Sequence, residues 1–314
     1  MTGLVTLKHT PLTSKKILIF GDKGQLGTAL KKALTTFNVI SADRETLDVS
    51  DSDKVNTYLN KVAPNIIFNA AAFTNVDLAE TETLTNKKIN AEFPQLLSEY
   101  VEKNKDCYLI HYSTDYVYSG ESSNVLSEDD SVGPINSYGI EKYNGECAIK
   151  KNTSRYLIFR TSWVFDHFHK NFLTTIIKFI ENKDFVSIVD DQLGAPTYAT
   201  DLAKYSIVAL EKALLNHDFL GQTYNLCNSG FCSWYEYANF IAKQAVHTNI
   251  SSKILQITPV SSSEYPTKAK RPKNSRMSTN KFKQTFQVSL PEWKDAINRC
   301  LIELKKNTPP HQSL

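Results

Sequence analysis

Short apolar runs alternate with longer amphipathic stretches through the first half of the chain, and this alternation constrains the fold most. The apolar runs cover residues 16–20, 38–42, 65–69, 108–113 and 156–160, and helical spacing of apolar residues is found at 26–34, 55–62 and 93–103. The runs are apolar almost throughout, so both faces of the sheet that they form are expected to be covered. This pattern predicts an α/β fold with a Rossmann-type, doubly wound parallel sheet.

The regular alternation of predicted strands and helices ends after about Trp163. This change predicts that a second structural region begins there. A chain of 314 residues corresponds to roughly two domains of ~150 residues each. We expect a flexible N-terminal arm over residues 1–15, a Rossmann domain over 16–165, and a smaller, less regular region over 166–314. Some segments of this last region are expected to return to the Rossmann domain.

Composition excludes several classes of protein. Lys and Arg number 36 and Asp and Glu number 33, and the net charge of +3 is too small to predict a nucleic-acid partner. No apolar run approaches the ~18 residues of a membrane helix. Residues 1–15 are polar, contain Pro11 and lack the apolar core of a signal peptide. The five cysteines form no Cys-x-x-Cys pair, which predicts reduced thiols and a cytoplasmic protein.

A glycine-rich turn directly follows the first predicted strand. Gly21, Gly24 and Gly27 form a Gly-x-x-Gly-x-x-Gly pattern ahead of a predicted helix. Backbone N–H groups and the helix dipole favour an anion there, and glycine lets the backbone approach a pyrophosphate closely. The pattern alone also fits a plain strand-to-helix turn. The pattern follows the first strand of a chain in which predicted strands and helices alternate. This position favours dinucleotide binding, with NADPH or NADH as the cofactor.

The end of the second predicted strand bears on the choice between these two cofactors. It carries Asp43 and Arg44 side by side. A carboxylate at this position accepts hydrogen bonds from the adenosine ribose and favours NADH, whereas a guanidinium pairs with the 2′-phosphate of NADPH. The chain offers both groups, so the sequence does not decide. For Arg44 a solvated charge pair at a strand end is an equal alternative.

Tyr138 and Lys142 are the candidate proton donor and its partner. They are four residues apart, which places them on one face of a helix. A neighbouring ammonium stabilises phenolate, so we expect Lys142 to lower the pKa of the phenol. The pair follows the fourth predicted strand, which ends in Ser113, Thr114 and Asp115. Ligands bind at the carboxyl ends of parallel strands, where a hydroxyl can bond the oxygen that Tyr138 protonates.

The order and spacing of these motifs resemble the extended short-chain dehydrogenase/reductase superfamily and, within it, the dTDP-4-dehydrorhamnose reductase family. The resemblance extends over nearly all of residues 16–304. Besides the glycine turn, it rests on segments 69–77 with Glu80, 113–118, 138–142, 160–164, 190–197, 264–267 and 270–276.

The resemblance implies roles for individual residues. It implies a catalytic triad of Thr114, Tyr138 and Lys142, with Thr114 where many members have serine. It implies cofactor contacts from Gly21, Gly24, Gln25, Leu26, Gly27, Asp43, Arg44, Asp48, Ala70, Ala71, Ala72, Tyr138 and Lys142. It implies substrate contacts from Thr74, Val76, Asp115, Trp163 and Arg271. For Trp163 an ordinary core aromatic is the alternative, and for Arg271 a solvated basic loop.

The activity that the resemblance implies is the NAD(P)H-dependent reduction of the C4 ketone of dTDP-4-dehydro-L-rhamnose to dTDP-L-rhamnose. Residues 166–314 would then hold most of the nucleotide sugar. Two alternatives stay open. One is a reductase of another 4-keto-6-deoxy sugar nucleotide, and the other is a non-catalytic subunit resembling the regulatory β subunit of methionine adenosyltransferase. A homodimer is compatible with the sequence, and neither a nucleic acid nor a membrane is expected as a partner.

The chain departs from the family pattern at one point. Some members are dimers bridged by magnesium through carboxylates, and the matching positions here are Ala29 and Thr200. Neither side chain offers the anionic oxygen that magnesium prefers, so we expect no bound metal. The best acidic pair, Asp190 and Asp191, is expected to lie in a hydrogen-bonded loop at a strand end.

Overall fold

A six-stranded parallel sheet forms the centre of the computed structural model, which describes residues 11–307. The strand order is β2 (Asn38–Ala42), β1 (Lys16–Phe20), β3 (Ile66–Asn69), β4 (Tyr108–Thr114), β5 (Tyr156–Thr161) and β10 (Gln222–Asn225). All five predicted strands are present, each within one residue of its expected bounds, and β10 comes from the second half of the chain. The predicted fold class is confirmed.

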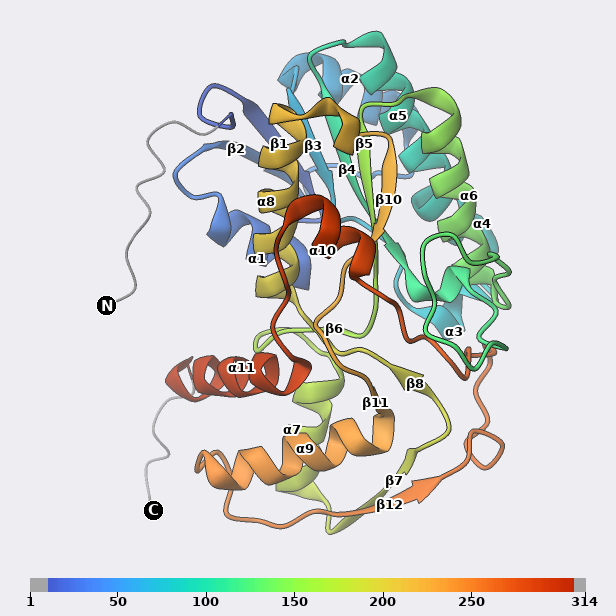
Figure 1. Ribbon diagram of the computed structural model, residues 1–314, viewed down its shortest axis with the longest axis vertical. Coiled ribbons are helices and arrows are strands. Elements are labelled where there is room, and N and C mark those ends of the chain that lie inside the picture. Colours follow the sequence, from blue (N-terminus) through green and yellow to red (C-terminus); the bar gives the residue numbers. More distant parts are fainter. Residues whose placement is uncertain (1–10, 308–314) are drawn as a thin grey trace.

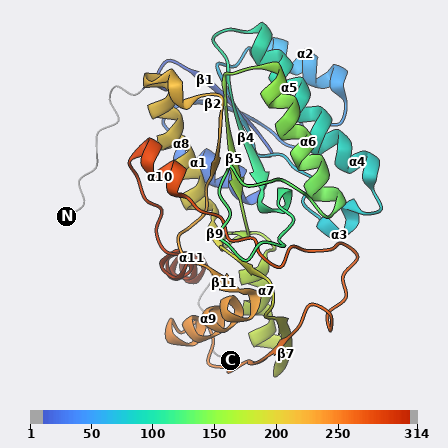
Figure 2. The ribbon, with the colours of Figure 1, turned by 45° about the vertical axis from the view of Figure 1, so that its right-hand side comes forward.

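Helices cover both faces of this sheet (Figures 1 and 2). One face carries α1 (Gln25–Ala33), α8 (Ala199–Leu215) and α10 (Asn280–Phe286), and the other carries α2 (Ser52–Val62), α5 (Phe93–Lys103) and α6 (Ser137–Asn152). Within β1, Ile17 and Ile19 pack into the first layer, whereas Leu18 and Phe20 pack into the second. Successive side chains of a strand point to opposite faces, which is why the strands are apolar throughout.

Short elements connect these layers. They are α3 (Val76–Ala79), α4 (Thr83–Lys87), the π-helical turn η1 (Lys88–Glu92) that leads into α5, and the 3₁₀ turns η2 (Asp115–Val117) and η3 (His217–Phe219).

A second lobe lies below the sheet in Figure 1 and has its own apolar core. It contains α7 (Phe172–Asn182), α9 (Trp234–His247), α11 (Trp293–Asn307) and the strand pair β7 (Phe185–Val189) with β12 (Gln256–Val260). Two-residue strands complete it: β6 (Val164–Phe165) with β9 (Thr197–Tyr198), and β8 (Leu193–Gly194) with β11 (Cys232–Ser233). This part of the chain is more regular than the sequence led us to expect.

The ends of the described chain correct one prediction. Residues 1–10 of the predicted N-terminal arm lie outside the described residues. In the rest of that arm, Leu12 is fully buried in the same apolar layer as Ile17 and Leu34, so residues 11–15 are not a loose segment. The boundary near residue 165 stays a prediction, although α8, β10 and α10 all lie against the sheet. Among the helices of residues 11–307, none is long and apolar enough to cross a membrane.

The sheet topology creates the place for a ligand. The chain leaves β1 in one direction to form β2 and then crosses back to form β3 on the other side of β1. The loops after β1 and β3 therefore diverge at their carboxyl ends, and open α/β sheets bind ligands in the crevice at such a point.

Candidate active site

A cleft of about 540 Å³ opens at the carboxyl ends of the central strands. Twelve of the predicted site residues line it: Gly21, Gly24, Gln25, Leu26, Asp43, Arg44, Ala70, Ala71, Ala72, Thr74, Tyr138 and Lys142. Sequence reasoning missed other lining residues, among them Lys23, Glu45, Ser113, His169 and Lys170. The structure therefore brings the glycine turn and the Tyr138–Lys142 pair into one cavity.

The glycine turn has the shape that a diphosphate requires. Gly21 has a φ of +78°, and a Cβ on it would stand 2.7 Å from the backbone nitrogen of Ala71. A Cβ on Gly27 would stand 2.1 Å from the carbonyl oxygen of Gly21, so Gly27 allows α1 to pack against the turn rather than lining the cleft. Gly24 caps α1 without a side chain, and the first N–H groups of a helix have no partner within it. These features fit the diphosphate of a dinucleotide.

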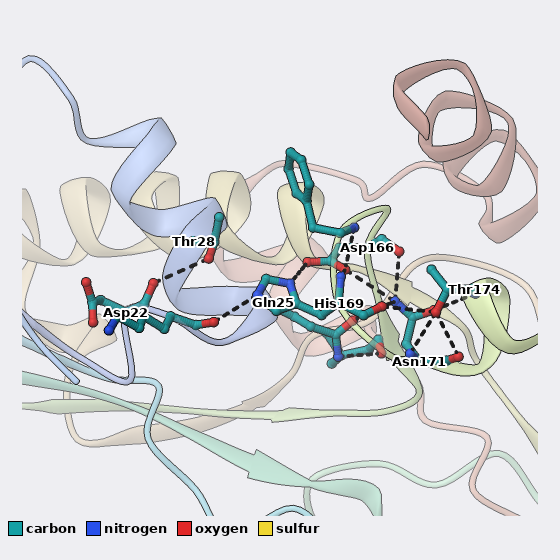
Figure 3. A network of polar contacts seen from close by, with 10 residues as sticks. Asp22, Gln25, Thr28, Asp166, His169, Asn171 and Thr174 are labelled. Atoms are coloured by element: carbon teal, nitrogen blue, oxygen red, sulfur yellow. Dashed lines mark hydrogen bonds and ion pairs between the residues drawn. The ribbon is translucent and has the colours of Figure 1, made fainter. Parts of the chain in front are cut away.

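The side chain of Gln25 is already engaged. Its Nε2 donates to the carbonyl of Val164 at 3.2 Å, and its Oε1 accepts from Asn171 at 3.0 Å (Figure 3). Gln25 therefore ties the glycine turn to the segment that leads into α7, and its backbone N–H is the group left for a ligand.

Asp43 and Arg44, the two charged residues that follow β2, differ in whether their side chains are free to contact a ligand. Asp43 accepts hydrogen bonds from Thr46 through Oδ1, and its Oδ2 lies 2.5 Å from the ammonium of Lys23. The hydrogen bonds from Lys23 and Thr46 hold the pKa of Asp43 well below its usual range. The guanidinium of Arg44 is exposed at the cleft and has no hydrogen bond or ion pair within the described residues. Arg44, and not Asp43, is therefore free to meet a ligand.

Lys142 is held in place by the end of β4. Its Nζ is buried and donates a 2.6 Å hydrogen bond to the carbonyl of Tyr112. Burial lowers the pKa of Lys142 to about 8, opposed by the nearby carboxylate of Glu146. Glu146 is itself fully buried and forms a two-pronged ion pair with Arg160 at 2.9 and 2.7 Å.

The environment of Tyr138 corrects the expectation about its pKa. Burial raises the pKa of the phenol well above its usual value, the carboxylate of Asp115 raises it further, and the hydrogen bond with Thr114 lowers it. The predicted lowering by Lys142 is not found, because burial dominates the pKa of the phenol and the ammonium of Lys142 donates to the carbonyl of Tyr112. At neutral pH Tyr138 is therefore a protonated phenol.

Thr114 and Asp115 are buried beside Tyr138 at the end of β4, although neither lines the main cleft. The hydroxyl of Thr114 donates to Oδ1 of Asp115 at 3.0 Å. Burial raises the pKa of Asp115 to about 6, against hydrogen bonds from Ser275 and Thr114 that lower it. A titratable carboxylate thus lies directly beside the hydroxyl predicted to orient a substrate carbonyl.

Two buried asparagines that the sequence did not single out connect the walls of the cleft. Asn86 donates to the carbonyl of Ser137 at 2.9 Å, just ahead of Tyr138, and accepts from Asn90 at 2.7 Å. Asn90 bonds both backbone groups of Phe73, in the loop after β3. Their four-residue spacing in a helix with a buried face is the only local signal that could have indicated them.

The remaining predicted residues lie outside the lining of the cleft. Asp48 is exposed, and its Oδ1 accepts from the backbone of Ser50 at 2.9 Å. Val76 begins α3. Trp163 stacks on Trp234 with ring centroids 3.6 Å apart, and it packs against the apolar core of the second lobe. Part of its surface stays exposed, so a role in substrate binding stays a prediction.

Arg271 is not the solvated basic residue that the alternative described. Its guanidinium forms a two-pronged pair with Asp77 at 2.7 and 3.3 Å. It also bonds Tyr116, whose ring lies edge-on to Tyr138 with centroids 6.1 Å apart. Arg271 therefore lies close to the predicted proton donor.

Asp190 and Asp191 occupy a hydrogen-bonded loop. Asp190 accepts from the hydroxyl of Ser233, and Asp191 accepts from the backbone and the hydroxyl of Ser262 at 2.8 Å each. Across residues 11–307, no group of three or more His, Cys, Asp or Glu side chains is arranged to hold a metal ion.

The chain is similar to proteins of one family over almost its whole length. The family model described as RmlD substrate binding domain matches residues 15–306. The dTDP-4-dehydrorhamnose reductase of Escherichia coli K12 is 37% identical over 297 residues, which cover 93% of this chain and 99% of the relative. That of Salmonella typhimurium is 35% identical over the same shares of the two chains.

Solved structures agree with these matches. The crystal structure of dTDP-4-dehydrorhamnose reductase from Bacillus anthracis in complex with NADP superposes with a TM-score of 0.84 at 32% identity, covering 92% of this chain and 99% of that one. A Thermus thermophilus UDP-glucose 4-epimerase superposes with a TM-score of 0.77 at 16% identity, covering 93% of this chain and 100% of that one, and shows the shared fold alone.

Proposed function

The chain belongs to the RmlD substrate binding domain family, together with the dTDP-4-dehydrorhamnose reductases, and from this membership we propose that it reduces the C4 ketone of dTDP-4-dehydro-L-rhamnose to dTDP-L-rhamnose with NADPH or NADH. One observation supports the proposal most directly: the glycine turn and the Tyr138–Lys142 pair line the same cleft. The glycine turn would hold the diphosphate of a dinucleotide, and Tyr138 and Lys142 line the same cleft into which the rest of the cofactor would extend.

The cofactor half of the cleft fits a dinucleotide. The N–H groups at the start of α1 face the diphosphate, and Ala70, Ala71 and Ala72 form a wall without bulky side chains. A bound nicotinamide cofactor supplies the hydride. Lys142, buried at the end of β4, binds the nicotinamide ribose with the N–H bonds that its contact with Tyr112 leaves free.

Tyr138 donates the proton from its Oη to the ketone oxygen. Because its pKa is raised, the phenol carries its proton at neutral pH, and the proton leaves only as negative charge develops on the substrate. Thr114 orients the carbonyl through its hydroxyl, and Lys142 stabilises the phenolate that remains. Asp115, next to Thr114, contacts the sugar.

The second lobe and the loop before α10 hold the nucleotide part of the substrate. Thr74 lies on the loop after β3 and Val76 begins α3. Trp163 packs in the second lobe, and Arg271 lies beside Tyr116, which contacts Tyr138. In this proposal Arg271 contacts the substrate diphosphate with its positive charge, although its guanidinium also binds Asp77 and donates to the carbonyl of Ala269.

The proposal is tested by loss of nicotinamide absorbance when 4-keto-6-deoxy sugar nucleotides are added to the purified chain. A panel that varies the base and the sugar stereochemistry, with NMR of each product, identifies the substrate. Turnover of dTDP-4-dehydro-L-rhamnose to dTDP-L-rhamnose above the other members of the panel is expected. No turnover of any member would favour the non-catalytic alternative, and preference for another sugar would favour the other reductase.

The proposal extends to the cellular location and the oligomeric state of the protein. We place the protein in the cytoplasm, which is consistent with the five cysteines that are all free thiols in the structure. Sedimentation of the purified chain tests whether it forms a homodimer.

A further inference from the structure

The segment between β6 and α7 carries a lysine that the proposed function does not yet use. Lys170 is exposed and lines the same cleft as the glycine turn. Within residues 11–307 its ammonium has neither a hydrogen bond nor an ion pair. We call the segment that carries it, residues 166–171, the clasp.

The two neighbours of Lys170 in the chain both contact the glycine turn. The ring nitrogen Nε2 of His169 lies 2.8 Å from the carbonyl oxygen of Lys23, and Nδ2 of Asn171 donates to Oε1 of Gln25 at 3.0 Å (Figure 3). Only one residue separates Lys23 from Gln25, the glycine that caps α1. The clasp therefore lies against the turn on both sides of the point where α1 begins, and Lys170 lies between the two contacts.

The backbone of the clasp is fixed on both sides of Lys170. Before it, Oδ1 of the buried Asp166 accepts from the backbone N–H of His169 at 2.9 Å. After it, Oδ1 of Asn171 accepts from the backbone N–H of Thr174 at 3.0 Å and caps α7. The fold thus sets where the Lys170 side chain leaves the backbone, which reduces the cost of ordering it around a ligand.

The other lysines of the cleft are already engaged. The ammonium of Lys23 is bound by two carboxylates after β2, and the buried Lys142 donates to a carbonyl of β4. Arg44 is free, but it follows β2, where the adenosine end of a dinucleotide is expected. Among the cleft-lining lysines of the described chain, Lys170 alone has no partner, and it lies beside the glycine turn.

We propose that Lys170 binds the diphosphate of the cofactor. The N–H groups at the start of α1 meet the diphosphate from the sheet side, and the ammonium of Lys170 meets it from the second lobe. Lysine suits this role because its ammonium is a compact charge that pairs with phosphate oxygens. The inference rests on the proposed function and adds to it a binding residue through which the cofactor is held by both lobes.

A nucleotide sugar also carries a diphosphate, and the place of Lys170 favours that of the cofactor. The contacts of the clasp are made to the glycine turn, which receives the dinucleotide. Arg271, which the proposed function assigns to the substrate diphosphate, belongs to a different segment and is bound to Asp77. The experiment therefore measures both ligands.

The Kd values of NADH and NADPH are measured by fluorescence for the wild type and Lys170→Met, at one pH and at two salt concentrations. Both Kd values should rise by a similar factor, about tenfold at low salt, because a charge-assisted contact to a group that the two cofactors share is lost. The factor should shrink at high salt, since an exposed ion pair is screened. Lys170→Arg keeps the charge and should bind both cofactors nearly as well as the wild type.

Lys178→Met is the matched control. Lys178 lies on α7 of the same lobe and is exposed, but it does not line the cleft, so its loss removes one charge without removing the contact. This variant should bind both cofactors as the wild type does. Thermal unfolding of each variant checks that the fold is intact, and the KM of the sugar nucleotide at saturating cofactor should be unchanged in Lys170→Met.

Several outcomes overturn the inference. Unchanged Kd values in Lys170→Met, or a loss confined to NADPH, would show that the ammonium does not contact the diphosphate. An equal loss in Lys178→Met would indicate a general effect of net charge, and a loss that Lys170→Arg does not restore would indicate a structural role. A raised KM of the sugar nucleotide with unchanged cofactor Kd would assign Lys170 to the substrate instead. If the wild type binds neither NADH nor NADPH, the proposed function itself fails.

Discussion

The ammonium of Lys142 donates a 2.6 Å hydrogen bond to the carbonyl oxygen of Tyr112, two residues before the end of β4. This contact fixes the charge at the carboxyl edge of the sheet, on the helix that also carries Tyr138. Burial lowers the pKa of Lys142 to about 8 and raises that of Tyr138. Both groups are therefore strongly influenced by their environment, as is common for residues that exchange protons.

Tyr138→Phe should lower kcat by about 10²–10⁴-fold, the range of general acid catalysis, and leave cofactor affinity nearly unchanged. Only the hydroxyl is lost, and the ring keeps its edge-on contact with Tyr116. Steady-state kinetics and NADPH titration measure the two effects. Tyr143→Phe on the same helix is the matched control and should behave as the wild type. A Tyr138→Phe enzyme within about threefold of wild type would remove the phenol from the mechanism.

Lys142→Met should weaken both the chemistry and cofactor binding. The methionine fills the apolar part of the site without burying a charge, so the fold should tolerate it. Loss of a charge-assisted hydrogen bond to the ribose corresponds to roughly 1.5–3 kcal/mol of binding free energy. Calorimetric titration with NADPH checks this value, and an unchanged affinity would show that the ammonium does not contact the ribose.

The sheet and the glycine turn could be predicted because each has a local cause. A strand buried on both faces must be apolar throughout, as β1 is, and Gly21 and Gly27 occupy positions where a Cβ would collide with backbone. By contrast, α8 was not predicted. It packs against both the sheet layer and α1, so its apolar residues are not confined to one stripe.

The parts of the candidate site that were not predicted depend on contacts between distant segments. His169 meets Lys23 across 146 positions, and Asn86 meets Ser137 across 51. No local pattern encodes either contact. The pKa of Tyr138 was misjudged for the same reason: a four-residue spacing places Lys142 on the same helix face, but only the fold shows that its ammonium points to Tyr112.

The choice between NADPH and NADH should depend on Arg44 and not on Asp43. Arg44 is free at the cleft, whereas Asp43 is bound by Thr46 and Lys23. Arg44→Ala should weaken NADPH about tenfold and NADH little, because only NADPH carries a 2′-phosphate. This differs from the sequence-based expectation that the carboxylate competes for the ribose. Titration of both cofactors against Arg44→Ala and Asp43→Asn distinguishes the two, and an NADH-selective loss in Asp43→Asn would restore that expectation.

Removal of divalent cations should leave turnover unchanged. The hydride comes from the cofactor and the proton from Tyr138, so the chemistry requires no metal. Ala29 packs against the apolar layer of the sheet, and Thr200 offers only a hydroxyl. Activity and sedimentation are compared after dialysis against EDTA, with and without added magnesium. Recovery of activity or of a dimer only when magnesium returns would contradict this prediction.

Asp115→Asn should make the protein more stable at pH 8 and less active. Burial raises the pKa of Asp115 to about 6, so between about pH 4 and 6 the folded chain binds more protons than the unfolded chain. The free energy of unfolding therefore falls as the pH rises through this window, and the loss persists above it. At 1.36 kcal/mol per unit of pKa, the neutral amide should recover about 3 kcal/mol at pH 8 and nothing near pH 4.

Urea unfolding of wild type and variant at both pH values measures the difference directly. The amide oxygen can still accept from Thr114, so a gain at pH 8 reports the removed charge rather than a lost contact. The same charge raises the pKa of Tyr138, so the variant also alters the acid that donates the proton. Equal stabilities at pH 8 would mean that Asp115 is not a costly buried charge. A more stable enzyme with lower kcat would mean that the chain keeps this charge for what it does beside Thr114.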